Sequence, residues 1–584
     1  MSGHPSFMRE ARRRHVFRTG ALYIVGAWVV LQVAGLAFES FGFPGTALRF
    51  LWYAAIAGFP ISLVFGWRYD ITASGIRKTL PAGDSDSTNQ RLRTVDFLIL
   101  GALGAVALTI ALRTVDEIRR TELQPAVEAL PAIARNTLAV LPLDNLTGDP
   151  EQDYLSAGMH DTLITSLSKI RSLRITSRTS AVRVDRSYNI PMIGKALGVA
   201  NILEGSVSRA GDRIRIIAQL IDASTDTHVW AQTYEREFSD LLSVQSDIAR
   251  DIAAAVQIQL SADEERALAS DGITRAETYD AYLRGMVQMH KESPQAYHEG
   301  IAIFTQALDN DPNSALAYAG LAYAYGKLGH SLFPVEGAYP KSRHAAMKAI
   351  ELDDTLAEAH LAVGMYKLYY EWDWTGAERS LLHAIELNPS LVAAHYHYAW
   401  MMELFADHDK ALFHGEITRE LDPLSPFYTA WLADQYRSAG LFEKAIREAE
   451  ETLVFSPDYP VALLTLGMTY AEIGRLDEAV AAHEKLRDVP FWSFALASTL
   501  ALAGRADEAL EMAGSINEEP FNAAPLILIH RSLRNDAEVF RWMTEAKNIH
   551  MPWYPWFITW FPQTRYLAAD PRMKELADEL KLRL

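Results

Sequence analysis

The second half of the chain repeats itself with a period near 34 residues, and this feature restricts its fold most strongly. Short loop motifs (DNDP, ELDD, ELNP, ELDP and VFSP) follow successive helical stretches, with a Pro or Asp at a matching position. These anchors are Pro312, Asp354, Pro389, Pro423, Pro457 and Pro490, with spacings of 42, 35, 34, 34 and 33 residues. A unit repeated at this interval buries its apolar face against its neighbours, which predicts an all-α solenoid over residues 277–514.

Residue types also recur inside each unit. A large-small pair such as Leu432-Ala433 marks the first helix, a Gly ends that helix, and an Ala stands where the two helices touch. The glycines are Gly329, Gly440, Gly474 and Gly504, and the alanines are Ala411, Ala445, Ala479 and Ala509. We expect a left-handed backbone at each of these glycines. In period and positions the segment resembles tetratricopeptide repeats, and the 42-residue step indicates an insertion, residues 330–342, between the paired helices of one repeat.

The resemblance implies a concave groove, lined by the first helix of each repeat, that binds a peptide or another protein. By repeat position, nine residues are expected to face this groove: Tyr396, Trp400, Glu403, Ala430, Asp434, Arg437, Leu464, Met468 and Glu472. The set is aromatic, apolar and acidic and lacks the Lys/Asn pattern of a carboxylate clamp, so a free C-terminal peptide is not specially favoured. The alternative is that these aromatic side chains only fill space between repeats.

Residues 137–262 show a different pattern. Short apolar runs alternate with helical stretches in the order βαβαβββα, and the last three strands are joined by polar turns, which predicts a small α/β domain with a mixed sheet and helices on one face. The acidic stretch 143–159 lacks the spacing of a calcium loop and is interpreted as a strand-to-helix turn. Gly148 is expected at positive φ there, and Pro150 should keep Asp149 extended.

Two motifs in this domain carry a second resemblance. The sequence LAVLPLDNLTGDPEQDYLSAGM, followed by LGVANILEGSV and a WAQTY strand, is similar to the TolB amino-terminal-like (FlgO-like) domain. Members of that family are mostly non-catalytic modules of envelope proteins, or are fused to transcription-regulator or class III nucleotide-cyclase domains. Neither fused domain is recognisable in this sequence, so a cyclase label inherited from such relatives would be unsupported.

The first 120 residues predict a membrane anchor. Windows 19–38, 50–67 and 97–112 contain no charged residue, and the first two are long enough to cross a hydrocarbon core of about 30 Å. We therefore expect three transmembrane helices within residues 19–113, after a basic tail (1–18) and before a linker (114–136). Lys and Arg concentrate before the first window and between the second and third. Because cytoplasmic loops carry such residues, the bulk of the chain is predicted to be periplasmic, at a bacterial inner membrane.

Charge and motif content exclude several functions. The net charge of −18 is the sum of +6 for residues 1–120 and −24 for residues 121–584. The acidic body of the chain argues against a nucleic-acid partner. Cysteine is absent. Ser166-x-x-Lys169 stands alone, without the partner motifs of penicillin-binding enzymes, and His395 and His397 point away from each other on a helix. No catalytic, cofactor-binding or metal-binding residue is assigned.

The sequence thus predicts a multidomain, non-catalytic scaffold with two interaction partners, a protein or peptide segment in the repeat groove and the lipid bilayer. Residues 515–584, with Trp553, Trp556 and Trp560, are expected to form a helical cap, or alternatively an aromatic patch for a partner. The alternative function is a solute- or envelope-sensing regulatory subunit that binds a ligand through the TolB-N-like domain.

Overall fold

The computed structural model describes residues 135–269, 275–331, 334–559 and 566–584, together with residues 16, 23–28, 31, 55, 59, 69–72 and 75–78. The chain divides into two compact units, Met1–Leu130 and Pro131–Leu584. In the first, residues 23–28 are helical, and strands β1 (Tyr69–Thr72) and β2 (Gly75–Lys78) pair antiparallel.

The three predicted spans lie outside the described residues, apart from the few positions named above. Among the helices that the structure does describe, none combines the length and the apolar composition needed to cross a bilayer. The membrane anchor and its orientation therefore stay predictions.

The second unit begins with a six-stranded mixed sheet, as the sequence predicts. Its strands are β3 (Thr137–Val140), β4 (Asp144–Asn145), β5 (Arg174–Ile175), β6 (Asn201–Ala210), β7 (Arg213–Asp222) and β8 (Thr227–Glu237). They lie in the order β5-β3-β6-β7-β8, with β4 beside β6. The β3 strand is parallel to β5 and β6, whereas β6, β7 and β8 form antiparallel hairpins.

Helices cover both faces of this sheet, which corrects the expectation of a single covered face. Side chains alternate along β3, so Leu138 and Val140 join the core under α5 (Asp153–Ser168) and α8 (Leu241–Ala255). Ala139 and Leu141 face the other way, into a smaller core with Ile193 of α7 (Ile190–Leu197). The remaining helices of the domain are α6 (Arg178–Arg183) and α9 (Ala262–Ala269).

The acidic stretch 143–159 is a turn, as predicted. Gly148 has φ +73°, and Asp149 is extended before Pro150. The Asn145 side chain accepts a hydrogen bond from the Thr147 backbone at 2.9 Å and donates to Asp153 at 2.7 Å. The Asp149 side chain accepts from the Glu151 backbone at 3.0 Å and so caps the short 3-10 helix Pro150–Gln152 that leads into α5.

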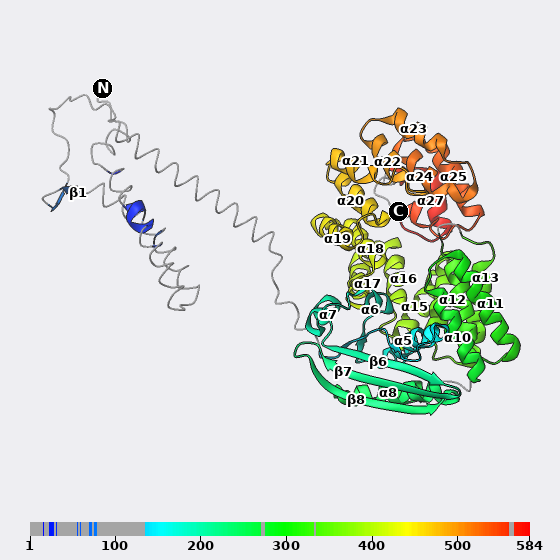
Figure 1. The fold of residues 1–584 in the computed structure, drawn as a ribbon. Helices are drawn as coiled ribbons and strands as arrows, with labels where there is room; N and C mark the ends of the chain where they lie inside the picture. The colour runs from blue at the N-terminus through cyan, green and yellow to red at the C-terminus, as the bar shows by residue number, and fades with distance from the viewer. Residues whose placement is uncertain are drawn as a thin grey trace, which may run out of the picture. The chain divides into compact units, whose positions relative to one another are not determined.

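Of the α-helices that follow in the described chain, the sixteen from α10 to α25 form eight successive pairs. The pairs are α10 (Ala276–Met289) with α11 (Pro294–Asn310), α12 (Ala315–Gly329) with α13 (Ala338–Leu352), α14 (Ala357–Tyr366) with α15 (Trp374–Leu387), α16 (Val392–Leu404) with α17 (His408–Leu421), α18 (Pro426–Ser438) with α19 (Phe442–Phe455), α20 (Pro460–Glu472) with α21 (Leu476–Glu484), α22 (Phe494–Leu502) with α23 (Ala506–Ser515), and α24 (Ala523–Ser532) with α25 (Asp536–Asn548). Each pair packs on the next, which is the tetratricopeptide-type solenoid that the period predicts (Figure 1). The predicted insertion, residues 330–342, comprises the connection between α12 and α13 and the first five residues of α13.

The small residues of the repeat occupy the positions that their size suggests. All four alanines expected at the helix contacts are fully buried: Ala411, Ala445, Ala479 and Ala509. Gly440, Gly474 and Gly504 have φ between +75° and +82°, which confirms three of the four left-handed positions. Gly329 was predicted wrongly, because it is the last residue of α12 and lacks a positive φ. A Cβ there would lie 2.9 Å from the Tyr339 ring, so close packing explains this Gly.

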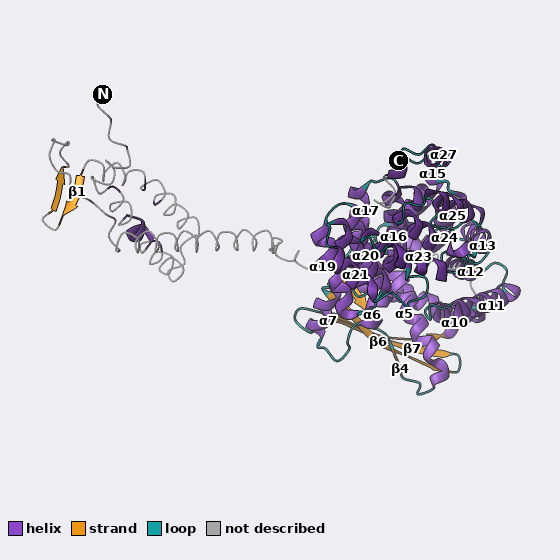
Figure 2. Cartoon of the chain, turned by 90° about the horizontal axis from the view of Figure 1, so that it is seen from above, coloured by secondary structure: helices purple, strands orange, loops and turns teal. Residues whose placement is uncertain are grey.

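The segment after residue 514 adds one more helix pair, α24 with α25, before the chain closes the array. It then passes through α26 (Trp556–Thr559) to α27 (Pro571–Glu579). Trp556 is buried and Trp553 is half-buried, whereas Trp560 lies outside the described residues. In Figure 2 the strands of the sheet domain gather at one side of this unit, and the helices of the array make up the rest.

Candidate functional site

The nine residues predicted to face the groove lie on three successive first helices, α16, α18 and α20. Within the described chain, seven of them are buried and two, Trp400 and Glu472, are half-buried. Ala430, Asp434 and Arg437 are at most 1% exposed, too little for a surface that a partner could reach directly. The structure therefore favours the packing interpretation for most of this set, and their binding role stays a prediction.

Three of the four charged members of the set form one ion-pair cluster. Arg437 Nε donates to Asp434 Oδ1 at 2.8 Å, and a second guanidinium nitrogen of Arg437 pairs with Glu472 on the next first helix. Burial raises the pKa of Asp434, whereas the adjacent guanidinium opposes that rise. These three side chains thus link α18 to α20, which is a structural role.

The chain's own C-terminal segment covers Trp400, one of the two aromatic members. Trp556 Nε1 donates a hydrogen bond to the Trp400 carbonyl at 3.2 Å, and the Trp556 ring stacks on Tyr369 with centroids 5.6 Å apart. Trp400 also meets the edge of Trp556 at 5.8 Å. Residues 551–559, which we call the C-terminal plug, therefore lie against the part of the predicted groove beside Trp400.

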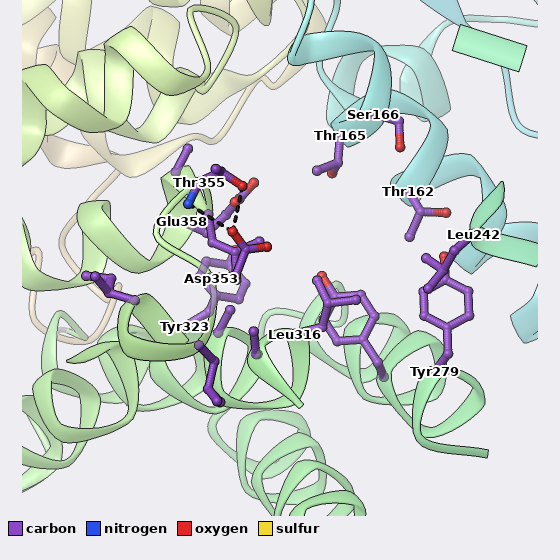
Figure 3. Close-up of a pocket in the computed structure, with 18 of the residues that line it drawn as sticks. Thr162, Thr165, Ser166, Leu242, Tyr279, Leu316, Tyr323, Asp353, Thr355 and Glu358 are labelled. Atoms are coloured by element: carbon purple, nitrogen blue, oxygen red, sulfur yellow. Dashed lines mark hydrogen bonds between the residues drawn. The ribbon is translucent and has the colours of Figure 1, made fainter. Parts of the chain in front are cut away.

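An open cavity of about 880 Å³ lies elsewhere, where the sheet domain meets the first three helix pairs. Its walls are α5 and α8 of the sheet domain, the first helices α10, α12 and α14, the end of α13, the loops that precede α12 and α14, and residues 387–388. Figure 3 shows Thr162, Thr165 and Ser166 of α5 on one side and Asp353, Thr355 and Glu358 on the other. We call this space the joint cavity. Its size is within the range of ligand-binding pockets.

Hydrogen bonds fix the wall of the joint cavity on the side of the sheet domain. The Gln245 side-chain amide of α8 donates to Thr162 Oγ1 at 2.7 Å and to the Tyr279 hydroxyl at 2.6 Å, so it joins α8, α5 and α10. On the opposite wall, Asp353 Oδ1 accepts from the Thr355 backbone at 3.0 Å and from its hydroxyl at 2.7 Å. Both walls are thus formed before any ligand arrives.

Two further contact sets hold the sheet domain against the array. At α6, Ser180 Oγ donates to Asp422 Oδ1 at 2.5 Å, on the loop between α17 and α18. At α5, Asp161 forms an ion pair with Arg178 at 2.6 Å and contacts His290 at the end of α10. The sheet domain is therefore attached to both the first and the fourth helix pair.

Sequence reasoning did not find the joint cavity, because its residues come from segments far apart in the chain. Ser166 and Lys169, which the sequence singled out as an isolated motif, do line it, and Lys169 Nζ donates to the Ala267 carbonyl at 3.1 Å. His395 and His397, the other pair considered, bond to His414 and Tyr369 respectively. Among the described residues, no group of three or more His, Asp and Glu is arranged to hold a metal ion.

Comparisons with known proteins give partial similarity. No family model matches the chain. A protein described as "Putative adenylate cyclase 3" from Rhizobium meliloti is 34% identical over 237 residues, which is 40% of each chain. The "Transcriptional regulator HilA" of Salmonella typhimurium is 25% identical over 210 residues, or 35% of this chain and 31% of the regulator. This chain thus spans at most two fifths of the length of the curated relatives it matches.

Solved structures with partial similarity include several helical-repeat proteins. The yeast Tom70 structure covers 59% of this chain and 82% of its own at 12% identity, with a TM-score of 0.35. A YrrB structure, described as a TPR protein with an unusual peptide-binding site, covers 36% and 96% at 16% identity, with a TM-score of 0.26. MamA covers 30% and 94% at 22% identity, with a TM-score of 0.24.

Proposed function

We propose that this protein is a non-catalytic interaction scaffold whose joint cavity receives a segment of a partner protein. The observation that carries the proposal is the contrast between two parts of the array. First helices α16, α18 and α20 bury their groove residues, and the C-terminal plug covers α16, whereas α10, α12 and α14 border an open cavity of about 880 Å³. A preformed, open recess on a repeat array suits a protein segment.

An occlusion variant tests this proposal. Thr165 is half-buried on α5 and faces the cavity, so Thr165→Trp should fill the space. The matched control is Thr305→Trp, on the exposed surface of α11. We expect wild type and the control to retain one crosslinked partner polypeptide in affinity capture and Thr165→Trp to lose it, with unchanged circular dichroism. Identical capture by all three chains would refute the assignment of the cavity.

The same proposal includes the location of the scaffold. Three uncharged windows at 19–38, 50–67 and 97–112, with Lys and Arg on one side, support a multi-pass anchor in a bacterial inner membrane and a periplasmic bulk. A reporter enzyme that is active only outside the cytoplasm, fused after residue 125, should then be active. Activity only of a cytoplasmic reporter at that site would contradict the proposed orientation.

A second candidate function is a ligand-sensing regulatory subunit. It is favoured by the joint cavity's volume and by α5, which contributes one wall from the domain that resembles TolB amino-terminal-like modules. A metabolite screen by thermal shift should then return a small molecule whose stabilising effect disappears in Thr165→Trp. The scaffold function instead predicts that the joint cavity binds a polypeptide.

No enzymatic activity is included in this proposal. The rhizobial relative carries the name of a cyclase, but the match takes in 40% of either chain, so we transfer no catalysis from it. We expect the full-length chain to form no cyclic AMP above a vector control. Nucleotide-dependent formation of cyclic AMP by the purified chain would overturn this part of the proposal.

A further inference from the structure

The joint cavity carries more negative than positive groups. Five carboxylates line it, against two cationic side chains: Asp311, Glu351, Asp353, Asp354 and Glu358, with Lys169 and Arg275. They come from the end of α5, the residue before α10, the end of α13, the start of α14 and the loops that precede α12 and α14. A low-dielectric recess of one sign concentrates the opposite charge.

The cations of the cavity are already engaged with backbone. Lys169 Nζ donates to the Ala267 carbonyl at 3.1 Å, and an Arg275 guanidinium nitrogen donates to the Asn310 carbonyl at 3.2 Å. One of the acids, Glu351, pairs with Lys348 at 2.6 Å. With two cationic side chains against five carboxylates, the lining keeps an excess of negative charge.

Among the described residues, four of the five carboxylates make no salt bridge, and Asp311 and Glu358 are the two with further evidence of burial. Asp311 is 9% exposed, and its Oδ2 is buried with no hydrogen-bond partner among the described residues. Glu358 makes no salt bridge within the described part of the chain, and burial raises its pKa, although the charge of Lys169 opposes that rise. Burying an ionised carboxylate is costly unless a cation or donor reaches it, so both positions favour a positively charged visitor.

The aromatic lining suits the same charge. Tyr279, Tyr282 and Tyr323 line the cavity, and burial raises the pKa of Tyr282, so its ring stays neutral. Tyr323 already receives one cation, because Lys327 Nζ of the same helix lies 5.5 Å from its ring centroid. Tyrosine faces attract ammonium and guanidinium groups, whereas they offer nothing comparable to an anion.

We propose that the joint cavity binds an ammonium or guanidinium group, held by Asp311 and Glu358 and flanked by the tyrosine rings. This inference rests on the proposed function, since it takes the group to be a Lys or Arg side chain of the partner segment. A free polyamine offers the same chemistry, and the experiment separates the two sources.

Calorimetric titration of the full-length chain tests the inference. The probes are a decapeptide of alternating Lys and Ala, the same peptide with Gln for Lys, and spermidine. Asp311→Asn and Glu358→Gln remove one charge each, and Glu511→Gln, on the exposed surface of α23, removes one charge away from the cavity. We expect the Lys peptide to bind and either cavity variant to weaken it about tenfold, with Glu511→Gln unchanged.

Each other outcome is also decisive. Equal binding of the Gln peptide would overturn the inference, because binding would then not require a cation. Equal weakening by Glu511→Gln would also overturn it, because binding would then depend only on the overall negative charge of the protein. Binding of spermidine without the Lys peptide would keep the cation site and overturn its assignment to a partner segment. If Thr165→Trp abolishes partner capture while no cationic probe binds, the cation site fails and the scaffold proposal stands. If cationic probes bind while Thr165→Trp leaves partner capture unaffected, the cation site stands and the scaffold proposal fails.

Discussion

Asp422 offers a direct measure of how the sheet domain is held to the array. It lies after α17, is 1% exposed, and accepts a hydrogen bond from Ser180 Oγ of α6 at 2.5 Å. The same hydroxyl accepts from the Leu424 backbone at 2.8 Å. Burial raises the pKa of Asp422 from 3.8 to about 6, although the hydroxyl contacts oppose the rise. The folded protein thus prefers the neutral acid.

The sign and size of the effect follow from linkage. Because the folded pKa lies above the unfolded one, the stabilisation from this group is complete below pH 3.8 and is lost as the pH rises through about 6. A difference of roughly two pKa units corresponds to about 3 kcal/mol. Asn cannot ionise and can still accept the Ser180 hydrogen bond. The free energy of unfolding of Asp422→Asn should therefore exceed that of wild type by up to about 3 kcal/mol at neutral pH. The two should converge in acid.

Urea unfolding of the full-length chain, followed by circular dichroism between about pH 4 and pH 8, measures this difference. Asp458→Asn is the control, because Asp458 is exposed on the corresponding loop of the next repeat. The control should follow wild type at every pH. An Asp422→Asn chain that is less stable than wild type at neutral pH, or a gap that does not change with pH, would refute the reasoning.

Three further variants probe other parts of the unit by thermal unfolding. Gly205→Ala places a Cβ 2.2 Å from the Ile217 carbonyl oxygen on the neighbouring strand, so it should lower the melting temperature of the sheet domain; an unchanged value would contradict the register. Asp161→Asn removes the carboxylate that pairs with Arg178 and should lower the free energy of unfolding by about 3 kcal/mol; an unchanged stability would mean that the pair is dispensable. Trp556→Ala should cost about 3–5 kcal/mol and alter tryptophan fluorescence, whereas a neutral effect would mean that the C-terminal plug is not packed.

Elements with a strong local signal were predictable from the sequence. The paired strands β6 and β7 begin and end within a residue of the alternating stretches, and the 34-residue period located α16 to α23. The strand β4 and the helix α6 were missed, because two and six residues are too short to show a period. Gly329 was misinterpreted because a contact with Tyr339, invisible in the repeat pattern, decides that position.

The candidate site was less accessible to such reasoning. Repeat position placed Trp400 and Arg437 on successive first helices. The exposure of Trp400 depends on where residues 551–559 fold back, and that of Arg437 on its contacts with Asp434 and Glu472. The joint cavity depends on the docking of α5 onto the array, through contacts such as that of Asp161 with His290. No local pattern encodes either event, since both are set by tertiary packing.

Because of the position of Trp556, any molecule that binds the middle of the array must compete with the chain's own C-terminal segment. A covalently attached occupant is present at an effective concentration on the order of millimolar, whatever the abundance of the protein. A free peptide at micromolar concentration would have to bind that stretch roughly a thousandfold more tightly to displace it. Only a high-affinity ligand can therefore displace the C-terminal plug from the stretch beside Trp400. The joint cavity, in contrast, stays accessible to ligands that bind weakly and exchange rapidly.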